Sequence, residues 1–149
     1  MQNLEKKALG MNILCAVLML GLLVCQFLPF WNGCSIQEYV WIPEDNKDVG
    51  TFLQERVGAE FAVGDVVAMP LLVLISGAAG VLLTLRSEPK MWTGIAGAVC
   101  GVSALWGYLS EQAFRMGSLW VVHLLLAIGI LVSAVSAILA NIKLARSEE

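Results

Sequence analysis

The chain is poor in the side chains that carry chemistry. It has a single histidine, His123, so a two-histidine metal motif such as H-E-x-x-H cannot form within one chain. Its four cysteines include no C-x-x-C pair, and neither a G-x-S-x-G nor a Walker loop is present. We therefore predict no metal site and no cofactor, and we expect that the protein is not an enzyme.

Charge is scarce as well. Only 14% of the residues are Asp, Glu, Lys or Arg, against about 25% in a typical soluble domain. The net charge is −3, and no stretch combines a basic patch with interleaved aromatic residues. These two features exclude a nucleic-acid partner.

Apolar length is what the sequence has in excess. Hydrophobic residues make up 58% of the chain, and its mean hydropathy is +0.79. A membrane-spanning helix needs roughly 20 mainly apolar residues to cross about 30 Å of hydrocarbon. Four uncharged runs satisfy this length, at 8–30, 66–85, 91–109 and 119–142. They predict a single all-α integral membrane domain over residues 1–149, built as a bundle of four transmembrane helices.

The placement of Lys and Arg predicts an orientation, because cytoplasmic loops carry an excess of these residues. One side of the predicted spans holds Lys6, Lys7, Arg86, Lys90, Lys143 and Arg146, and the other holds Lys47, Arg56 and Arg115. We therefore expect both termini in the cytoplasm and the loop 31–65 outside. The chain has no N-x-[ST] acceptor site, which favours a bacterial plasma membrane.

Small residues mark the expected contact faces, since helices in lipid associate by close packing. In the third run Gly97 and Gly101 form a G-x-x-x-G pair, one turn after Gly94. The second and fourth runs contribute Ser76, Gly80, Gly129 and Ser133. These residues predict packing within one bundle, and a face for a dimer or a partner subunit is the alternative.

The loop 31–65 is aromatic and acidic. Its segment "SIQEYVWI" has the composition of a β-strand, and Pro43 ends that segment. Apolar residues then recur at near-helical spacing over 48–57. We expect a short strand or hairpin, followed by a short amphipathic helix on the membrane surface or the top of the bundle.

The same loop holds the predicted partner-contact residues, which are Tyr39, Trp41, Glu44, Asp45 and Asp48. Aromatic residues dominate interface energetics, so Tyr39 and Trp41 are the expected anchors. A calcium loop is disfavoured, because Val49 stands where an EF-hand needs glycine. Cys34 is alone outside the spans, which leaves a free thiol, a bond between chains and lipidation open.

Tyr108, Glu111 and His123 are the nearest candidate for a polar constellation. Tyr108 and Glu111 are i, i+3 neighbours at the outer end of the third run, and His123 lies at a similar depth in the fourth. A Glu111–His123 contact could tune the protonation of the imidazole near neutral pH. The alternative is a contact that only joins two helices at the interface.

These observations predict a small non-enzymatic membrane protein, an accessory or scaffold subunit that acts through helix packing and its outer loop. Its expected partners are the lipid bilayer and another membrane protein or further copies of itself. The alternative is a transporter or channel subunit. In that case oligomerisation would have to build the pathway, since one chain places no Lys, Arg, Asp or Glu at mid-membrane depth.

Overall fold

The computed structural model describes residues 2–31, 34–41, 63–85, 91–110, 114–115, 117 and 119–148. Four long helices dominate these residues: α1 (Gln2–Gln26), α4 (Val63–Leu85), α5 (Trp92–Ser110) and α6 (Trp120–Glu148). A short two-stranded ladder, β1 (Pro29–Trp31) and β2 (Cys34–Ser35), follows α1, and a short helix α2 (Ile36–Trp41) follows the ladder.

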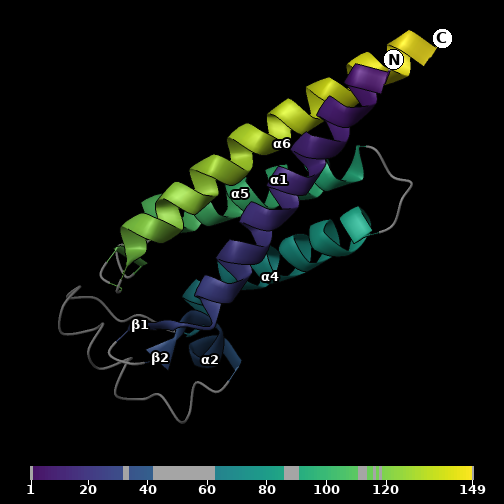
Figure 1. Cartoon of the computed structure of the whole chain (residues 1–149). Coiled ribbons are helices and arrows are strands. Elements are labelled where there is room, and N and C mark those ends of the chain that lie inside the picture. The colour runs from purple at the N-terminus through teal and green to yellow at the C-terminus, as the bar shows by residue number, and fades with distance from the viewer. Residues whose placement is uncertain are drawn as a thin grey trace.

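The four long helices form a bundle. α1 packs between α4 and α6, and α5 also contacts both of them, so that α1 and α5 lie across the bundle from each other. Both chain ends lie at one end of the bundle, which we call the terminal end (Figure 1). The ladder and α2 lie at the opposite end, which we call the head end (Figure 1).

α1 is displaced toward the N-terminus relative to the predicted span 8–30. It begins at Gln2 because its first turns pack on the end of α6, where Leu4 and Ala8 contact Ala140 and Leu144. It ends at Gln26 in a tightened turn, in which the amides of Phe27 and Leu28 donate to carbonyls three residues back. Pro29 follows, and a proline disfavours the helical conformation at the residue before it, here Leu28. α6 is likewise extended at its C-terminal end, to Glu148 instead of residue 142.

The segment after α1 differs from the expected order of elements. Pro29 pairs with Ser35 and Trp31 with Cys34 in an antiparallel ladder, so the hairpin precedes the residues predicted as a strand. Ile36–Trp41, the core of that predicted strand, is helical. Tertiary contacts override the strand-like composition, because Ile36 is fully buried and Gln37 bonds to α4. The amphipathic helix predicted over 48–57 lies outside the described residues.

Among the described residues, three helices are long and apolar enough to cross a membrane, at Asn3–Gln26, Trp92–Ser110 and Trp120–Ser147. In α4 the corresponding apolar stretch, Pro70–Leu85, is shorter. Pro70 lies two turns into α4, which begins at Val63, three residues before the predicted run 66–85. α5 differs from the predicted span 91–109 by only one residue at each end.

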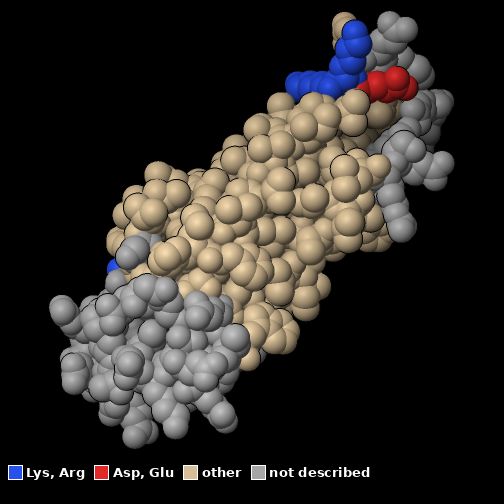
Figure 2. Space-filling model, turned by 60° about the horizontal axis from the view of Figure 1, so that its bottom comes forward, with Lys and Arg blue, Asp and Glu red and all other residues tan. Residues whose placement is uncertain are grey.

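The core of the bundle is mainly apolar in its middle, where the hydroxyls of Ser76 and Ser133 bond within their own helices, and it is more polar toward both ends. Cys15, Met19, Cys100, Ile130 and Ala134 are fully buried in the middle. Large apolar side chains remain exposed around the outside of all four helices, among them Val17, Leu20, Leu82, Val102, Leu125 and Val132. On the face drawn in Figure 2, the described charged side chains gather at one end of the bundle, a small basic area is visible at the edge near the other end, and uncharged surface lies between them.

Candidate functional site

The most concentrated polar group of the described core lies at the head end, where three helices bring one polar side chain each. Gln26 ends α1, Tyr108 lies in the last turn of α5, and His123 lies in the first turn of α6. Nε2 of Gln26 lies 3.2 Å from the Tyr108 hydroxyl, and that hydroxyl lies 2.8 Å from Nδ1 of His123. We call these three residues the polar relay.

In one assignment of donors and acceptors, the Tyr108 hydroxyl both accepts and donates a hydrogen bond. The Gln26 amide nitrogen donates to the Tyr108 oxygen, so the hydroxyl proton is free to point at His123. Nδ1 of His123 then accepts, which places the imidazole proton on Nε2 in the neutral ring. The arrangement ties α1, α5 and α6 together by hydrogen bonds among buried groups.

One polar atom of the relay has no hydrogen-bond partner among the described residues. Oε1 of Gln26 is buried, and no donor among the described residues lies within hydrogen-bond distance of it. A buried acceptor without a partner costs roughly 1–3 kcal/mol. The amide is therefore only half satisfied, which distinguishes it from the Tyr108 hydroxyl.

Aromatic rings enclose the relay. The Phe30 ring centroid lies 4.9 Å from that of His123, and the Phe114 centroid lies 5.7 Å from that of Tyr108. The two phenylalanine rings are 6.5 Å apart, and Tyr108 and His123 meet edge to face. Such tilted and edge-on contacts are the preferred geometry of aromatic pairs. We call the relay together with Phe30 and Phe114 the aromatic cap.

The backbone is adapted to hold this cap. A Cβ atom at Gly117 would collide with the ring of Phe30, so only glycine fits there. Leu119 has a φ of 56°, in the left-handed region that costs a non-glycine residue roughly 1–2 kcal/mol. The carbonyl of Leu119 accepts from the amides of Val122 and His123, so this turn starts α6 and places His123.

A second polar contact joins α2 to α4. Nε2 of Gln37 donates to the carbonyl of Pro70 at 3.0 Å, and Oε1 of Gln37 accepts from the indole of Trp41 at 2.9 Å. The buried amide is thus bonded on both sides, while the Trp41 side chain remains 61% exposed. Gln37 therefore holds an exposed tryptophan in a fixed position on the head end.

Of the predicted polar constellation, Tyr108 and His123 lie in contact, as just described. Glu111 lies outside the described residues. Of the predicted partner-contact residues, Tyr39 and Trp41 lie in α2, and Glu44, Asp45 and Asp48 lie outside the described residues.

The small residues selected from the sequence face the interior of the bundle or contact a neighbouring helix. A Cβ atom at Gly94 or Gly101 would come within 3.2 Å of a backbone carbonyl of α6, and one at Gly97 would collide with Sγ of Cys15. A Cβ atom at Gly80 would collide with Met19 of α1. Gly129 sits beside Leu18 at an ordinary distance, and Ser76 and Ser133 donate to the carbonyls of Leu72 and Ile130 within their own helices.

No set of three His, Cys, Asp or Glu side chains in the described part of the chain is placed to hold a metal ion. Val49, at the position where a calcium loop needs glycine, lies outside that part. Cys15, Cys25 and Cys100 are free thiols within α1 and α5.

Sequence reasoning missed several members of these sites. Gln26 was visible only as a polar residue near the end of a span, and Phe30, Phe114 and Gln37 stood in no motif. A buried glutamine at the end of an apolar run is the signal that could have found Gln26, since such groups need partners.

The chain matches no protein-family model, no curated protein and no solved structure.

Proposed function

We propose that the protein is an integral membrane protein with four crossings, and that it acts as a non-enzymatic accessory or scaffold subunit through its head end. The observation that supports insertion is the uncharged exterior. Between the charged ends, exposed Leu, Val, Ile and Trp side chains cover helices of membrane-spanning length. Water would be a poor solvent for that surface, and hydrocarbon a good one.

The length of the bundle fits the same proposal. α5 has 19 residues, about 28 Å at 1.5 Å per residue, which matches roughly 30 Å of hydrocarbon. The tryptophans Trp92 and Trp106 are exposed toward its two ends, as expected for aromatic belts. In the proposed orientation the terminal end is cytoplasmic, because Lys6, Lys7, Lys143 and Arg146 lie there.

Trp41 supports the role of the head end. The glycine faces of α4 and α5 contact neighbouring helices of the bundle, so little of their surface is accessible to a partner. Trp41 is exposed, and Gln37 holds its indole. An exposed tryptophan that is already held in place loses little conformational entropy on binding, and tryptophan is enriched among the residues that dominate interface energetics.

The test is purification of the tagged protein in a mild detergent, with Trp41→Ala compared to Trp92→Ala. The control is matched, because Trp92 is 59% exposed at the opposite end of the bundle. We expect a stoichiometric membrane partner with the wild type and with Trp92→Ala, and loss of that partner with Trp41→Ala. Because Trp41→Ala also removes the donor to Oε1 of Gln37, it should lower stability by no more than about 1–3 kcal/mol and leave the bundle folded. A wild-type chain that purifies alone would reject the accessory role, and a closed homo-oligomer would favour the transport alternative.

Orientation is tested separately. A tag on either terminus is expected to resist an impermeant reagent in intact cells and to react once the membrane is opened. Modification of a terminal tag in intact cells would reverse the proposed orientation and would leave the bundle itself unaffected.

A further inference from the structure

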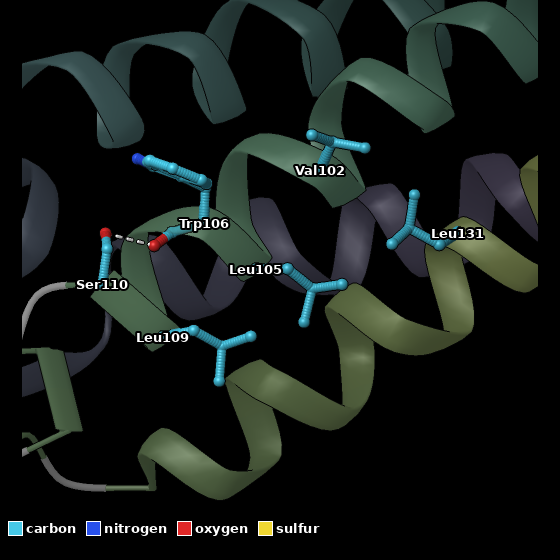
Figure 3. Close-up of a pocket in the computed structure, with 6 residues that line it drawn as sticks. All are labelled: Val102, Leu105, Trp106, Leu109, Ser110 and Leu131. Carbon is cyan, nitrogen blue, oxygen red and sulfur yellow. Dashed lines mark hydrogen bonds between the residues drawn. The ribbon is translucent and has the colours of Figure 1, made fainter.

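A shallow apolar groove runs along the outer face of α5 beside α6. Its volume is about 410 Å³, within the range of roughly 300–1,000 Å³ that small ligands occupy. Figure 3 shows the side chains that line it, with Leu105 and Leu109 turned toward α6 and Leu131 coming from α6 itself. The lining is completed by Val102, Trp106 and Ser110.

The groove is open to the surroundings of the bundle and lacks charge. The Trp106 side chain is 74% exposed. The Ser110 hydroxyl donates to the backbone carbonyl of Trp106, so the one polar side chain of the lining is satisfied within α5 (Figure 3). From Val102 to Ser110 the groove follows about 12 Å of helix, ending where α5 ends.

A fixed cation lies at the head end of this groove. Nη1 of Arg115 donates to the carbonyl of Leu109 at 2.9 Å, and Leu109 lines the groove. The guanidinium is exposed, and a guanidinium has five N–H donors, so one bond to a carbonyl leaves others for a second ligand. Arg115 therefore caps the C-terminus of α5 and also presents a positive charge beside the groove.

We propose that this groove binds one phospholipid, with an acyl chain against Val102, Leu105 and Leu109 and the phosphate on the Arg115 guanidinium. Charge complementarity identifies the occupant. A phospholipid combines a long apolar chain with a phosphate at the membrane surface. The groove matches this order, because its apolar lining begins at Val102 and the cationic Arg115 lies at its head end. Arginine binds phosphate oxygens with paired, charge-assisted hydrogen bonds.

The site rests on the proposed membrane insertion. The phospholipid site goes beyond membrane insertion, because a bulk bilayer would cover all exposed faces alike, whereas this site prefers lipids with a net negative headgroup. In phosphatidylglycerol the phosphate charge is not balanced by a cationic group, as it is in phosphatidylcholine.

The experiment titrates the detergent-purified protein with phosphatidylglycerol and with phosphatidylcholine of the same chains, and counts bound lipids by native mass spectrometry. We expect one phosphatidylglycerol to bind at least tenfold more tightly than phosphatidylcholine. Arg115→Gln is expected to remove most of that preference, and Val102→Phe, which fills the groove, to weaken both lipids.

Two matched variants serve as controls. Arg146→Gln removes an exposed cation at the opposite end of the bundle, and Val132→Phe enlarges a valine that is 62% exposed outside the groove, against 57% for Val102. Both are expected to bind lipid like the wild type. The proposal is overturned if Arg115→Gln behaves like Arg146→Gln, or if Val102→Phe changes only the fraction of dimer, which would make the groove a contact between copies.

Flotation with phosphatidylcholine vesicles separates this proposal from the previous one. A protein that does not float with the vesicles refutes membrane insertion itself. A protein that floats but binds both lipids equally refutes only the phospholipid site.

Discussion

The bundle is held together differently at its middle and at its head end. In the middle, glycines of α5 let the backbone of α6 approach, so that Gly94 and Gly101 face the carbonyls of Ala134 and Ala127. We call this contact the glycine seam. At the head end the space between the helices is filled by the aromatic cap, whose rings are spaced by 4.9–6.5 Å. In the glycine seam α5 contributes no side chain to the contact, whereas the aromatic cap is built from side chains.

The difference follows from the interactions that are available in each region. In the membrane insertion proposed above, burial of apolar surface would not drive the helices together, and close packing of small residues would. At the head end the chain also has to anchor β1 and the start of α6, and Phe30 and His123 do this by packing on each other. The seam should therefore be sensitive to added volume, and the cap to lost hydrogen bonds.

The largest expected effect comes from adding volume to the seam. In Gly101→Leu the new side chain would meet the Ala127 carbonyl and the side chain of Leu131, and in Gly97→Leu it would meet Cys15 and Ala134. Overpacking typically costs about 1–3 kcal/mol and sometimes more, and here backbone atoms have to move. We expect a large loss of folded monomer in detergent, measured by thermal unfolding and size-exclusion chromatography.

Gly10→Leu is the matched control for that prediction. Gly10 lies in α1, and among the described residues no atom lies within 4 Å of a Cβ built there. Its substitution should leave the unfolding temperature unchanged or raise it slightly, because glycine is a poor helix former. If Gly97→Leu and Gly101→Leu were as harmless as Gly10→Leu, the seam would not be a close contact.

A smaller effect is expected from removing the hydroxyl of the cap. Tyr108→Phe keeps the ring but deprives both the Gln26 amide and Nδ1 of His123 of their partner. Leaving buried polar groups unpaired costs about 1–3 kcal/mol. We expect a lower unfolding temperature, with unchanged helix content by circular dichroism.

Gln26→Met tests whether that cost comes from unpaired groups. The substitution loses one hydrogen bond, but it also removes the unpaired Oε1 atom. Its effect should be smaller than that of Tyr108→Phe, because Tyr108 keeps its bond to His123. Equal losses in the two variants would mean that the Gln26–Tyr108 bond, and not the Tyr108–His123 bond, supplies the stabilisation.

The two regions were not equally predictable from the sequence. The seam lies on one helix at fixed spacing, so Gly97 and Gly101 mark it by themselves, and close packing needs the absence of a Cβ atom. The cap draws on residues from Gln26 to His123, and only the Tyr108–His123 part of it follows from depth in adjacent helices. Phe30 enters it from a hairpin that lies earlier in the chain than the strand or hairpin predicted from the segment "SIQEYVWI".

The head end also shows where composition misleads. Ile36, Tyr39, Val40 and Trp41 favour a strand, yet Ile36–Trp41 is helical because Gln37 reaches α4 and bonds Trp41 one turn later. Propensity is a weak guide for six residues whose contacts are with a distant segment. The long apolar runs were predictable because their length alone decides them, although α1 and α6 extend past the runs where they pack on each other.

The smallest expected effect lies at the terminal end, where a third kind of contact joins α1 to α6. Nδ2 of Asn141 donates to Oδ1 of Asn12 at 3.1 Å and to the carbonyl of Ala137 at 2.7 Å. Hydrogen bonds between membrane helices average only about 0.6 kcal/mol in double-mutant cycles, because polar groups also find partners in the unfolded state. The cycle of Asn12→Ala, Asn141→Ala and the double variant should therefore give a coupling free energy of about 0.5–1 kcal/mol by unfolding in detergent.

A coupling near zero would mean that Asn141 is satisfied by the Ala137 carbonyl alone, and that only apolar packing of Ala8 on Ala140 and Leu144 joins the helices here. A coupling above about 2 kcal/mol would mean that the Asn12–Asn141 contact at the terminal end is stronger than membrane helices usually show, and comparable to the cost expected for Tyr108→Phe at the head end.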